Sequence, residues 1–177
     1  MSLISKFGLS LPARKLILLT LSIPDNEGKT ATDIVHINKI LKYYSQLSES
    51  SDIKFSNFNL GAVSFEVEEN VEILQEYGFI KQIQKDKYKL TSKGEEVVKE
   101  LSNNTDITML EKLNYSKKLL NDLSFDELLY FMYMKFPDTQ ENSTQITRLK
   151  KMNKGLIRRL FEKKKIDDYT AQTWINS

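Results

Sequence analysis

Apolar residues recur at helical spacing along most of the chain. In residues 32–47, Ile37, Ile40, Leu41 and Tyr44 repeat every three or four positions, which is the spacing of one buried face of an α-helix. Polar residues occupy most positions between them. Similar patterns, together with capping and terminating residues, predict helices near residues 12–22, 32–47, 64–77, 92–101, 107–120, 124–136 and 143–165.

Two short stretches have the composition of strands. Residues 79–83 and 88–90 are rich in β-branched, aromatic and other apolar side chains and flank a lysine-rich turn. The order helix, two strands, helix predicts a winged helix-turn-helix core over residues 11–104. Residues 105–177 then form a helical extension packed on that core. The expected fold class is therefore mainly α with a small β-wing.

Local signals mark several helix ends. Ser124 and Glu127 have the spacing of a capping box, and so do Ser92 and Glu95. Gly155 costs the last helix about 1 kcal/mol relative to alanine. That helix is therefore weakest at Gly155, which is the candidate position for a break.

Composition narrows the class of protein. The 177 residues are 40% hydrophobic and 28% charged, which is typical of a globular protein. With no cysteine, the chain has neither a disulfide framework nor a thiolate metal site, as is usual in a reducing cytoplasm. The apolar run at 16–21 is far shorter than the ~20 residues that span a bilayer. We expect a cytoplasmic protein without a membrane partner.

Catalytic motifs are missing from the sequence. The six glycines are scattered and form no phosphate-binding loop or dinucleotide motif, and no GxSxG elbow occurs. His36 is the only histidine and lies on a predicted helix, where packing is the usual role. The acidic pairs at 68–69 and 167–168 point in different directions on a helix, so they do not form a metal site. We expect no enzymatic activity, cofactor or metal.

Charge is unevenly distributed along the chain. The segment 148–165 holds nine basic residues and one acidic residue, a net charge of +8, while the chain as a whole is +2. The predicted wing and its exit carry five lysines against Asp86. Such basic segments indicate an anionic partner, although a solvated lysine-rich helix is the alternative reading. The candidate DNA-binding residues are Lys81, Lys85, Lys87, Lys89, Lys93, Arg148, Lys150, Lys151, Lys154, Arg158 and Arg159.

The helix at 64–77 has the opposite charge. It precedes the wing, in the place where a winged helix normally inserts a helix into the major groove. It holds no base and five glutamates, which phosphates would repel. We therefore expect salt-sensitive, largely non-specific DNA binding through the wing and the last helix. The alternative is a protein partner that binds Glu66, Glu68, Glu69, Glu72 and Glu76.

Two segments around the wing carry a family resemblance. Residues 72–80 and 88–94, EILQEYGFI and YKLTSKG, resemble a signature of prokaryotic winged-helix proteins. The run 11–146 resembles a family of small, mostly uncharacterised archaeal and bacterial winged-helix proteins and, distantly, Panacea-type antitoxin domains. The further matching pieces are residues 11–16, 36–40, 61–64 and 123–130. The resemblance implies a winged-helix fold and a regulatory role, and it implies no catalytic site.

Apolar helices after the wing raise the question of a dimer. The helices within 107–134 have enough apolar surface to pair with a second copy, or they complete the core of the monomer. The tyrosines on helical stripes are expected in the core rather than stacked on single-stranded bases. Trp174 lies in a polar segment, so we expect that segment to fold back on the body of the protein or onto a partner. Together these features favour a DNA-binding transcriptional regulator, with a protein-interaction module as the alternative.

Overall fold

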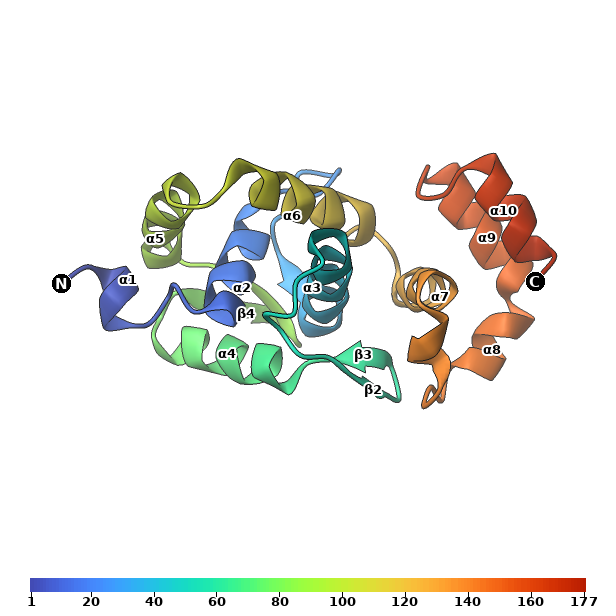
Figure 1. The fold of residues 1–177 in the computed structure, drawn as a ribbon, viewed down its shortest axis with the longest axis horizontal. Coiled ribbons are helices and arrows are strands. Elements are labelled where there is room, and N and C mark those ends of the chain that lie inside the picture. The colour runs from blue at the N-terminus through green and yellow to red at the C-terminus, as the bar shows by residue number, and fades with distance from the viewer. The chain divides into compact units, whose positions relative to one another are not determined.

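A computed structural model describes residues 1–177, of which 60% are helical and 10% lie in strands (Figure 1). The chain forms two compact units. The first unit comprises Met1–Phe55 and Ser64–Asp122, and the second comprises Ser56–Val63 and Leu123–Ser177. The chain therefore passes from one unit to the other three times. The expectation of a mainly helical protein with a small sheet is confirmed.

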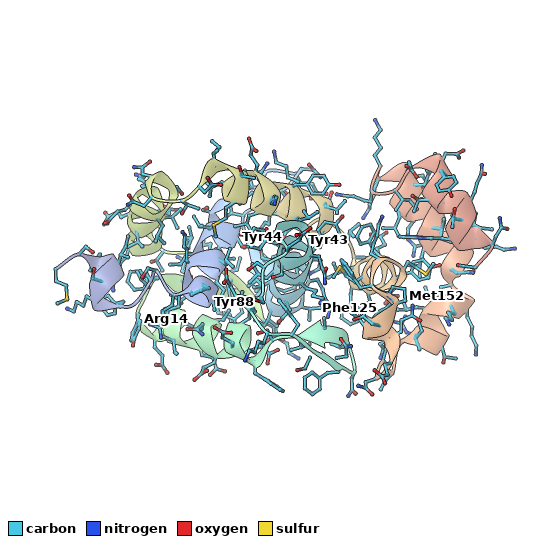
Figure 2. The ribbon with its side chains drawn as sticks, in the orientation of Figure 1. Arg14, Tyr43, Tyr44, Tyr88, Phe125 and Met152 are labelled. Carbon is cyan, nitrogen blue, oxygen red and sulfur yellow. The ribbon has the colours of Figure 1, made fainter.

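Six helices build the first unit around α2. Every residue from Leu16 to Leu21 is buried, because α2 packs against α4, α5 and α6 (Figure 1). Arg14 at the start of α2 donates to Asn70 of α4 over 2.8 Å (Figure 2). The helices of this unit are α1 (Leu3–Lys6), α2 (Pro12–Ser22), α3 (Ile34–Ser48), α4 (Phe65–Glu76), α5 (Ser92–Asn103) and α6 (Ile107–Leu120).

The first unit also holds a three-stranded antiparallel sheet. Its strands β1 (Thr32–Asp33), β4 (Ile80–Gln84) and β5 (Lys87–Leu90) lie in the order β1-β5-β4. The two-residue turn between β4 and β5 is tight, and Asp86 adopts a left-handed conformation with φ of 58°. An irregularity between Gln82 and Gln84 shifts the register near that turn. The pattern of short apolar stretches had predicted both strands of this hairpin.

Side-chain caps set the starts of the main helices in this unit. Asp33 accepts from the backbone N–H of His36, and Ser64 accepts from Val67. The prediction that Ser92 caps α5 is wrong, because Thr91 occupies that position and accepts from the N–H of Gly94. Each cap satisfies a donor that the first helical turn would otherwise leave unpaired.

The second unit is built around α7 (Phe125–Lys135). Most of α7 is buried, since it packs against α8, α9 and the hairpin of β2 (Ser56–Phe58) and β3 (Gly61–Val63). Asn57 of the hairpin donates to the carbonyl oxygen of Asp138 over 3.0 Å, and Asn142 donates to the carbonyl of Asn57 over 3.0 Å. The remaining elements are η1 (Pro137–Gln140), α8 (Ile146–Lys151), α9 (Asn153–Glu162) and α10 (Asp168–Ile175).

The C-terminal segment folds back as expected. α10 brings the Trp174 ring to 6.1 Å from the ring of Tyr130 and 6.0 Å from that of Phe131, edge-on in both cases. Trp174 is 7% exposed. The expectation that the tyrosines belong to the core holds for Tyr44, Tyr130 and Tyr133. It fails for Tyr169, which is 79% exposed, and Tyr43 is half-buried. Of the apolar residues that could have formed a dimer surface, Leu128, Leu129, Phe131 and Met132 are buried inside this unit, and Met134 is half-buried.

Two expected boundaries differ from the structure. The division after residue 104 separates α6 from the first unit, whereas α6 packs against α3 within it. The prediction of a single helix at 143–165 is wrong, because α8 and α9 are separate helices. The break lies at Met152 and not at Gly155 (Figure 2). The N–H of Met152 bonds to the carbonyl of Leu149, a closure one residue shorter than in an α-helix, which ends α8.

The helices also bear on the membrane question. No helix combines the length and the apolar character that crossing a bilayer requires.

Candidate nucleic-acid interface

Four lysines of the β4–β5 hairpin gather on one small element, and we call them the β4–β5 lysines: Lys81, Lys85, Lys87 and Lys89. Lys81 and Lys89 are direct cross-strand partners, so their side chains share a face of the sheet. Lys87 lies two residues before Lys89 and faces the same way. None of the four forms an ion pair.

This arrangement is electrostatically unfavourable in the free protein. Like charges directly opposite one another weaken a strand pair. The tight turn fixes Lys85 at the tip, and the only acid of the hairpin, Asp86, lies beside it. A bound anion would relieve the repulsion between these ammonium groups. The hairpin is therefore suited to phosphate contact through point charges rather than through reading of bases.

Lys93 has a different role from the other wing lysines. Its ammonium group donates to the carbonyl oxygen of Tyr77 over 2.7 Å and so satisfies the C-terminal end of α4. The same group lies 4.2 Å from the ring centre of Phe79 and 4.7 Å from that of Phe7. These contacts hold Lys93 against the protein, so it is a structural cation.

Part of the basic C-terminal segment is neutralised within the second unit. Arg148 donates to both carboxylate oxygens of Asp126, over 2.9 and 2.6 Å. These hydrogen bonds hold the pKa of Asp126 below its usual value. Arg158 faces Glu162 at 3.8 Å in an exposed pair, and such pairs are weak. The guanidinium group of Arg148 is thus paired with a carboxylate of α7.

Glu127 forms ion pairs with two further basic residues, one in α9 and one directly after it. Arg159 lies 3.1 Å from one carboxylate oxygen, and the ammonium of Lys163 lies 2.6 Å from the other. The backbone N–H of Ser124 also donates to this carboxylate and completes the predicted capping box. Burial opposes ionisation of Glu127, but the bonds from Lys163, Ser124 and Arg159 outweigh it and lower its pKa. Only Lys150, Lys151 and Lys154 of the predicted C-terminal set form no ion pair.

The acidic face of α4 is exposed. Glu69, Glu72 and Glu76 follow Phe65 at helical spacing and form one stripe, opposite the buried residues of the helix. Phe65 is 64% exposed, and no glutamate of α4 forms a salt bridge. Glu66 is exposed beside this stripe, while Glu68 is half-buried and near Lys39. The predicted acidic residues are therefore brought together, apart from Glu68.

Two fully buried lysines were not expected from the sequence. Lys117 of α6 is fully buried and donates to the carbonyl oxygen of Thr30 over 2.9 Å and to the hydroxyl of Thr32. Burial lowers its pKa to about 7, against the opposing effect of Asp25. Burial likewise lowers the pKa of Lys39 to about 8. Position 117 continues the stripe of Leu113 and Leu120, so its spacing could have revealed the burial.

The single histidine packs at a helix start. The ring Nδ1 of His36 lies 2.7 Å from the carboxylate of Asp33, which also caps α3. Burial opposes ionisation of Asp33, but its bonds with His36 outweigh that effect and lower its pKa. No group of three His, Asp or Glu side chains converges as a metal site would require. The absence of catalysis stays a prediction.

Comparisons with protein-family models, with curated proteins and with solved structures find no match for this chain. The resemblance of residues 72–94 to winged-helix proteins stays an expectation that rests on their sequence.

Proposed function

We propose that the first unit is a winged-helix domain that binds the phosphates of duplex DNA through its β4–β5 hairpin, as part of a transcriptional regulator. Two features of the architecture support this. The elements α2, β1, α3, α4, β4 and β5 come in the order of a winged helix, with the β2–β3 hairpin inserted between α3 and α4. The sheet order β1-β5-β4 also agrees with that arrangement, because the first strand pairs with the last.

The single observation that carries the proposal is the set of β4–β5 lysines without ion-pair partners. The repulsion between Lys81 and Lys89 is retained in the protein, and a phosphate between them would turn it into attraction. By contrast, Arg148 and Arg159 already bind carboxylates of α7. The hairpin is therefore the stronger anion site, and the C-terminal helices are secondary.

The acidic α4 restricts the mode of binding. Its exposed glutamates would meet the negative potential of the major groove. Docking by the hairpin keeps the affinity dependent on phosphates and nearly independent of sequence. This mode resembles binding by wings and arms that follow the backbone more than reading by a recognition helix.

Fluorescence anisotropy of a labelled random duplex tests the proposal. With three to four phosphates neutralised, the slope of about −0.9 per contact predicts affinity falling roughly 40- to 150-fold between about 50 and 200 mM salt. Replacing all four β4–β5 lysines by glutamine should abolish binding. The matched control replaces four other lysines of the first unit: Lys6, Lys54, Lys99 and Lys112.

Three outcomes are distinguishable. Loss of binding only in the hairpin variant supports the proposal. Equal loss in the control variant would mean that net charge alone drives the interaction. Undiminished binding by the hairpin variant, with loss on replacing Lys150, Lys151 and Lys154 by glutamine, would transfer the site to the second unit and refute the role of the hairpin.

The acidic stripe of α4 favours a second candidate function, recognition of a basic protein. Phe65 lies within the stripe, and a large exposed aromatic surrounded by charge is typical of an interaction surface. A lysine-rich peptide serves as the probe in calorimetry. Binding that disappears when Glu69, Glu72 and Glu76 become glutamine would support this function. The control replaces Glu95, Glu96 and Glu100 of α5, and an equal loss there would argue against the stripe.

A further inference from the structure

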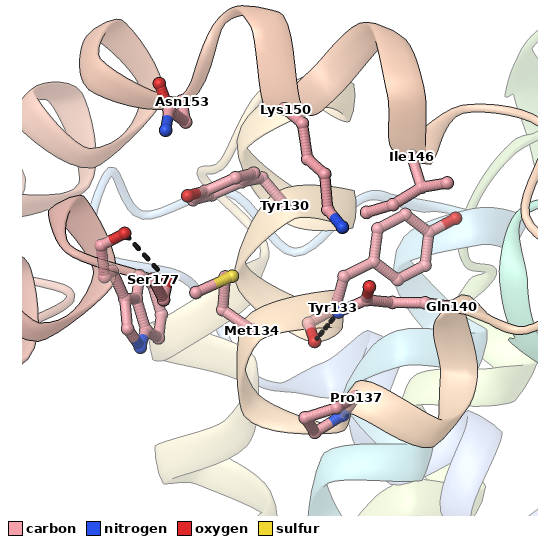
Figure 3. A pocket seen from close by; sticks show the side chains of 10 residues that line it. Tyr130, Tyr133, Met134, Pro137, Gln140, Ile146, Lys150, Asn153 and Ser177 are labelled. Atoms are coloured by element: carbon pink, nitrogen blue, oxygen red, sulfur yellow. Dashed lines mark hydrogen bonds between the residues drawn. The ribbon is translucent and has the colours of Figure 1, made fainter.

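A pocket of about 370 Å³ lies entirely within the second unit. It is bordered by α7, η1, α8, α10 and the first residue of α9, so every wall comes from elements of one unit (Figure 3). The volume falls in the range of small-molecule sites. Its lining residues are Tyr130, Tyr133, Met134, Pro137, Gln140, Ile146, Lys150, Asn153, Trp174 and Ser177.

The ring of Tyr130 is buried, and its hydroxyl opens on the pocket without a protein partner. The residue is 2% exposed, and no hydrogen bond reaches its hydroxyl group. In Figure 3 the hydroxyl projects from the ring of Tyr130 toward the space between Asn153 and Met134. The hydroxyl oxygen is not one of the buried polar atoms that lack a partner, so it can be reached from the pocket. The hydroxyl is therefore aimed into the pocket with its bonding capacity unused.

The other polar groups of the pocket that have no partner are also donors. The indole N–H of Trp174 has no acceptor. Asn153 uses its side-chain oxygen to accept from the N–H of Lys154 over 2.7 Å, which leaves its NH₂ group. Lys150 is the one charged residue of the lining, and it forms no ion pair. No side chain of the lining is acidic, so Lys150 provides the side-chain charge that an anion would meet in the pocket.

Several lining groups already have partners and so limit the ligand. Gln140 donates from its amide nitrogen to the carbonyl of Tyr133 over 2.9 Å, and the hydroxyl of Ser143 donates to the phenol oxygen of Tyr133 over 2.6 Å. These bonds fix the wall on that side. The faces left for contact are the aromatic rings, Met134, Pro137 and Ile146, which suit an apolar body.

We propose that this pocket binds a small organic monocarboxylate with an aromatic or other apolar body. The carboxylate accepts from the Lys150 ammonium and the Tyr130 hydroxyl, and the body lies against the rings of the lining. Charge-assisted bonds of this kind are about twice as strong as neutral ones, so the acid is preferred over its amide. The site is separate from the β4–β5 lysines and does not depend on the proposed DNA binding.

Trp174 makes the test specific, since it is the only tryptophan of the chain and lines the pocket. The full chain is titrated with 3-phenylpropionate while its tryptophan emission is followed. We expect a saturable change in emission at up to millimolar concentrations. The neutral probe 3-phenylpropanamide should bind about tenfold more weakly, which corresponds to one charged bond of about 1.4 kcal/mol.

Two variants separate the polar contacts. Lys150→Met should weaken the carboxylate about tenfold and leave the amide unchanged. Tyr130→Phe keeps the ring and its packing, and it should weaken the carboxylate while the fold, followed by circular dichroism, stays intact. Lys154→Met is the matched control, because Lys154 lies nearby on α9 but does not line the pocket. It should bind both probes as the parent does.

Three results would overturn the proposal. They are a lack of saturation with the carboxylate at millimolar concentration, equal affinity for acid and amide, and an equal effect of Lys154→Met and Lys150→Met. Because Lys150 was also a candidate for DNA contact, the anisotropy assay is repeated on Lys150→Met. Unchanged DNA binding with lost carboxylate binding distinguishes the two sites.

Discussion

Lys117 and Lys39 place amines where water does not reach. Lys117 has no exposed surface, and Lys39 is 1% exposed. Burial costs the charged form its hydration, and the pKa values of about 7 and about 8 measure how far the protein opposes protonation. These groups make the stability of the first unit depend on pH near neutrality, where few other side chains titrate.

The sign of that dependence follows from proton counts. The ordinary pKa of lysine is 10.5, so between about pH 7 and pH 10 the unfolded chain binds more protons than the folded one. The free energy of unfolding should therefore rise with pH across this window. Its limit is about 1.4 kcal/mol per pH unit for each lysine. Urea unfolding at about pH 7 and pH 9.5 measures the rise.

Lys117→Met should reduce the slope of this profile to the part that Lys39 contributes, because the variant has no amine to protonate at position 117. The control Lys112→Met removes a charge from the same helix but from a less buried position, and it should keep the parental slope. The measurement to compare is the slope of the unfolding free energy with pH. The absolute free energy also changes, because methionine cannot make the hydrogen bond to Thr30. Parallel profiles for parent and Lys117→Met would contradict the assigned burial.

Gly94 and Gly155 form a natural pair for substitution. A Cβ on Gly94 would lie 2.1 Å from the carbonyl oxygen of Phe79, which is backbone and cannot step aside. Gly94→Ala should therefore lose roughly 1–3 kcal/mol of stability. A Cβ on Gly155 meets only the end of Arg159 at 3.6 Å, so Gly155→Ala should gain roughly 1 kcal/mol in helix α9. Thermal unfolding of both variants checks the opposite signs.

At the scale of elements, Glu127 connects α7 to α9 and to the residue that follows it, Lys163. Its buried carboxylate accepts hydrogen bonds from Arg159, Lys163 and the backbone N–H of Ser124 at the same time. Glu127→Gln should lower the free energy of unfolding by roughly 1–3 kcal/mol near neutral pH. The control is Glu162→Gln, whose exposed pair with Arg158 should change stability by less than about 0.5 kcal/mol.

The contribution of the Glu127 ion pairs to stability depends on pH in a different range from that of the buried lysines, because it is lost in acid. The folded pKa of Glu127 lies below its ordinary value, so its contribution is present above that ordinary value and disappears as the pH falls through the folded pKa. The difference between parent and Glu127→Gln should shrink accordingly in acid. A difference that persists in acid would show that packing, rather than charge, accounts for the loss.

Periodicity predicted most elements but could not reveal how they pair. The stripe of α3 and the two strands of the β4–β5 hairpin follow from local spacing. The break at Met152 does not, because Leu149, Leu156 and Leu160 continue one apolar pattern across it. The ion pair of Arg148 spans 22 residues, and the sequence shows the charges without the distance between them.

At the scale of the whole chain, the β2–β3 hairpin belongs to a unit whose other residues come much later. Its alternation is too short to predict where it packs, since its partners are the backbone of Asp138 and Thr144 and the side chain of Asn142. This is why a division at residue 104 missed it. Sequence reasoning could place the candidate lysines of β4 and β5, but neither the pocket nor the unused hydroxyl of Tyr130, because both depend on helices brought together from separate segments.

The hydrogen bonds of that hairpin predict a local response in a distant segment. Asn142→Ala removes the donor to the carbonyl of Asn57. Losing one bond of about 1 kcal/mol should speed hydrogen exchange of residues 56–63 by roughly fivefold. Exchange in α2 should stay unchanged, and so should all rates in the control Asn104→Ala. Equal acceleration in α2 would mean that the two units open together.

The order of synthesis gives the hairpin a further consequence. Asn57 leaves the ribosome 81 residues before its partner Asp138. At roughly 5–20 residues per second, that interval lasts about 4–16 s. During this time the helices of the first unit can form, while the β2–β3 hairpin still lacks the surface on which it packs. The nascent chain therefore exposes the edges of this short strand pair until α7 and η1 emerge. We expect chaperone binding to be strongest during that interval.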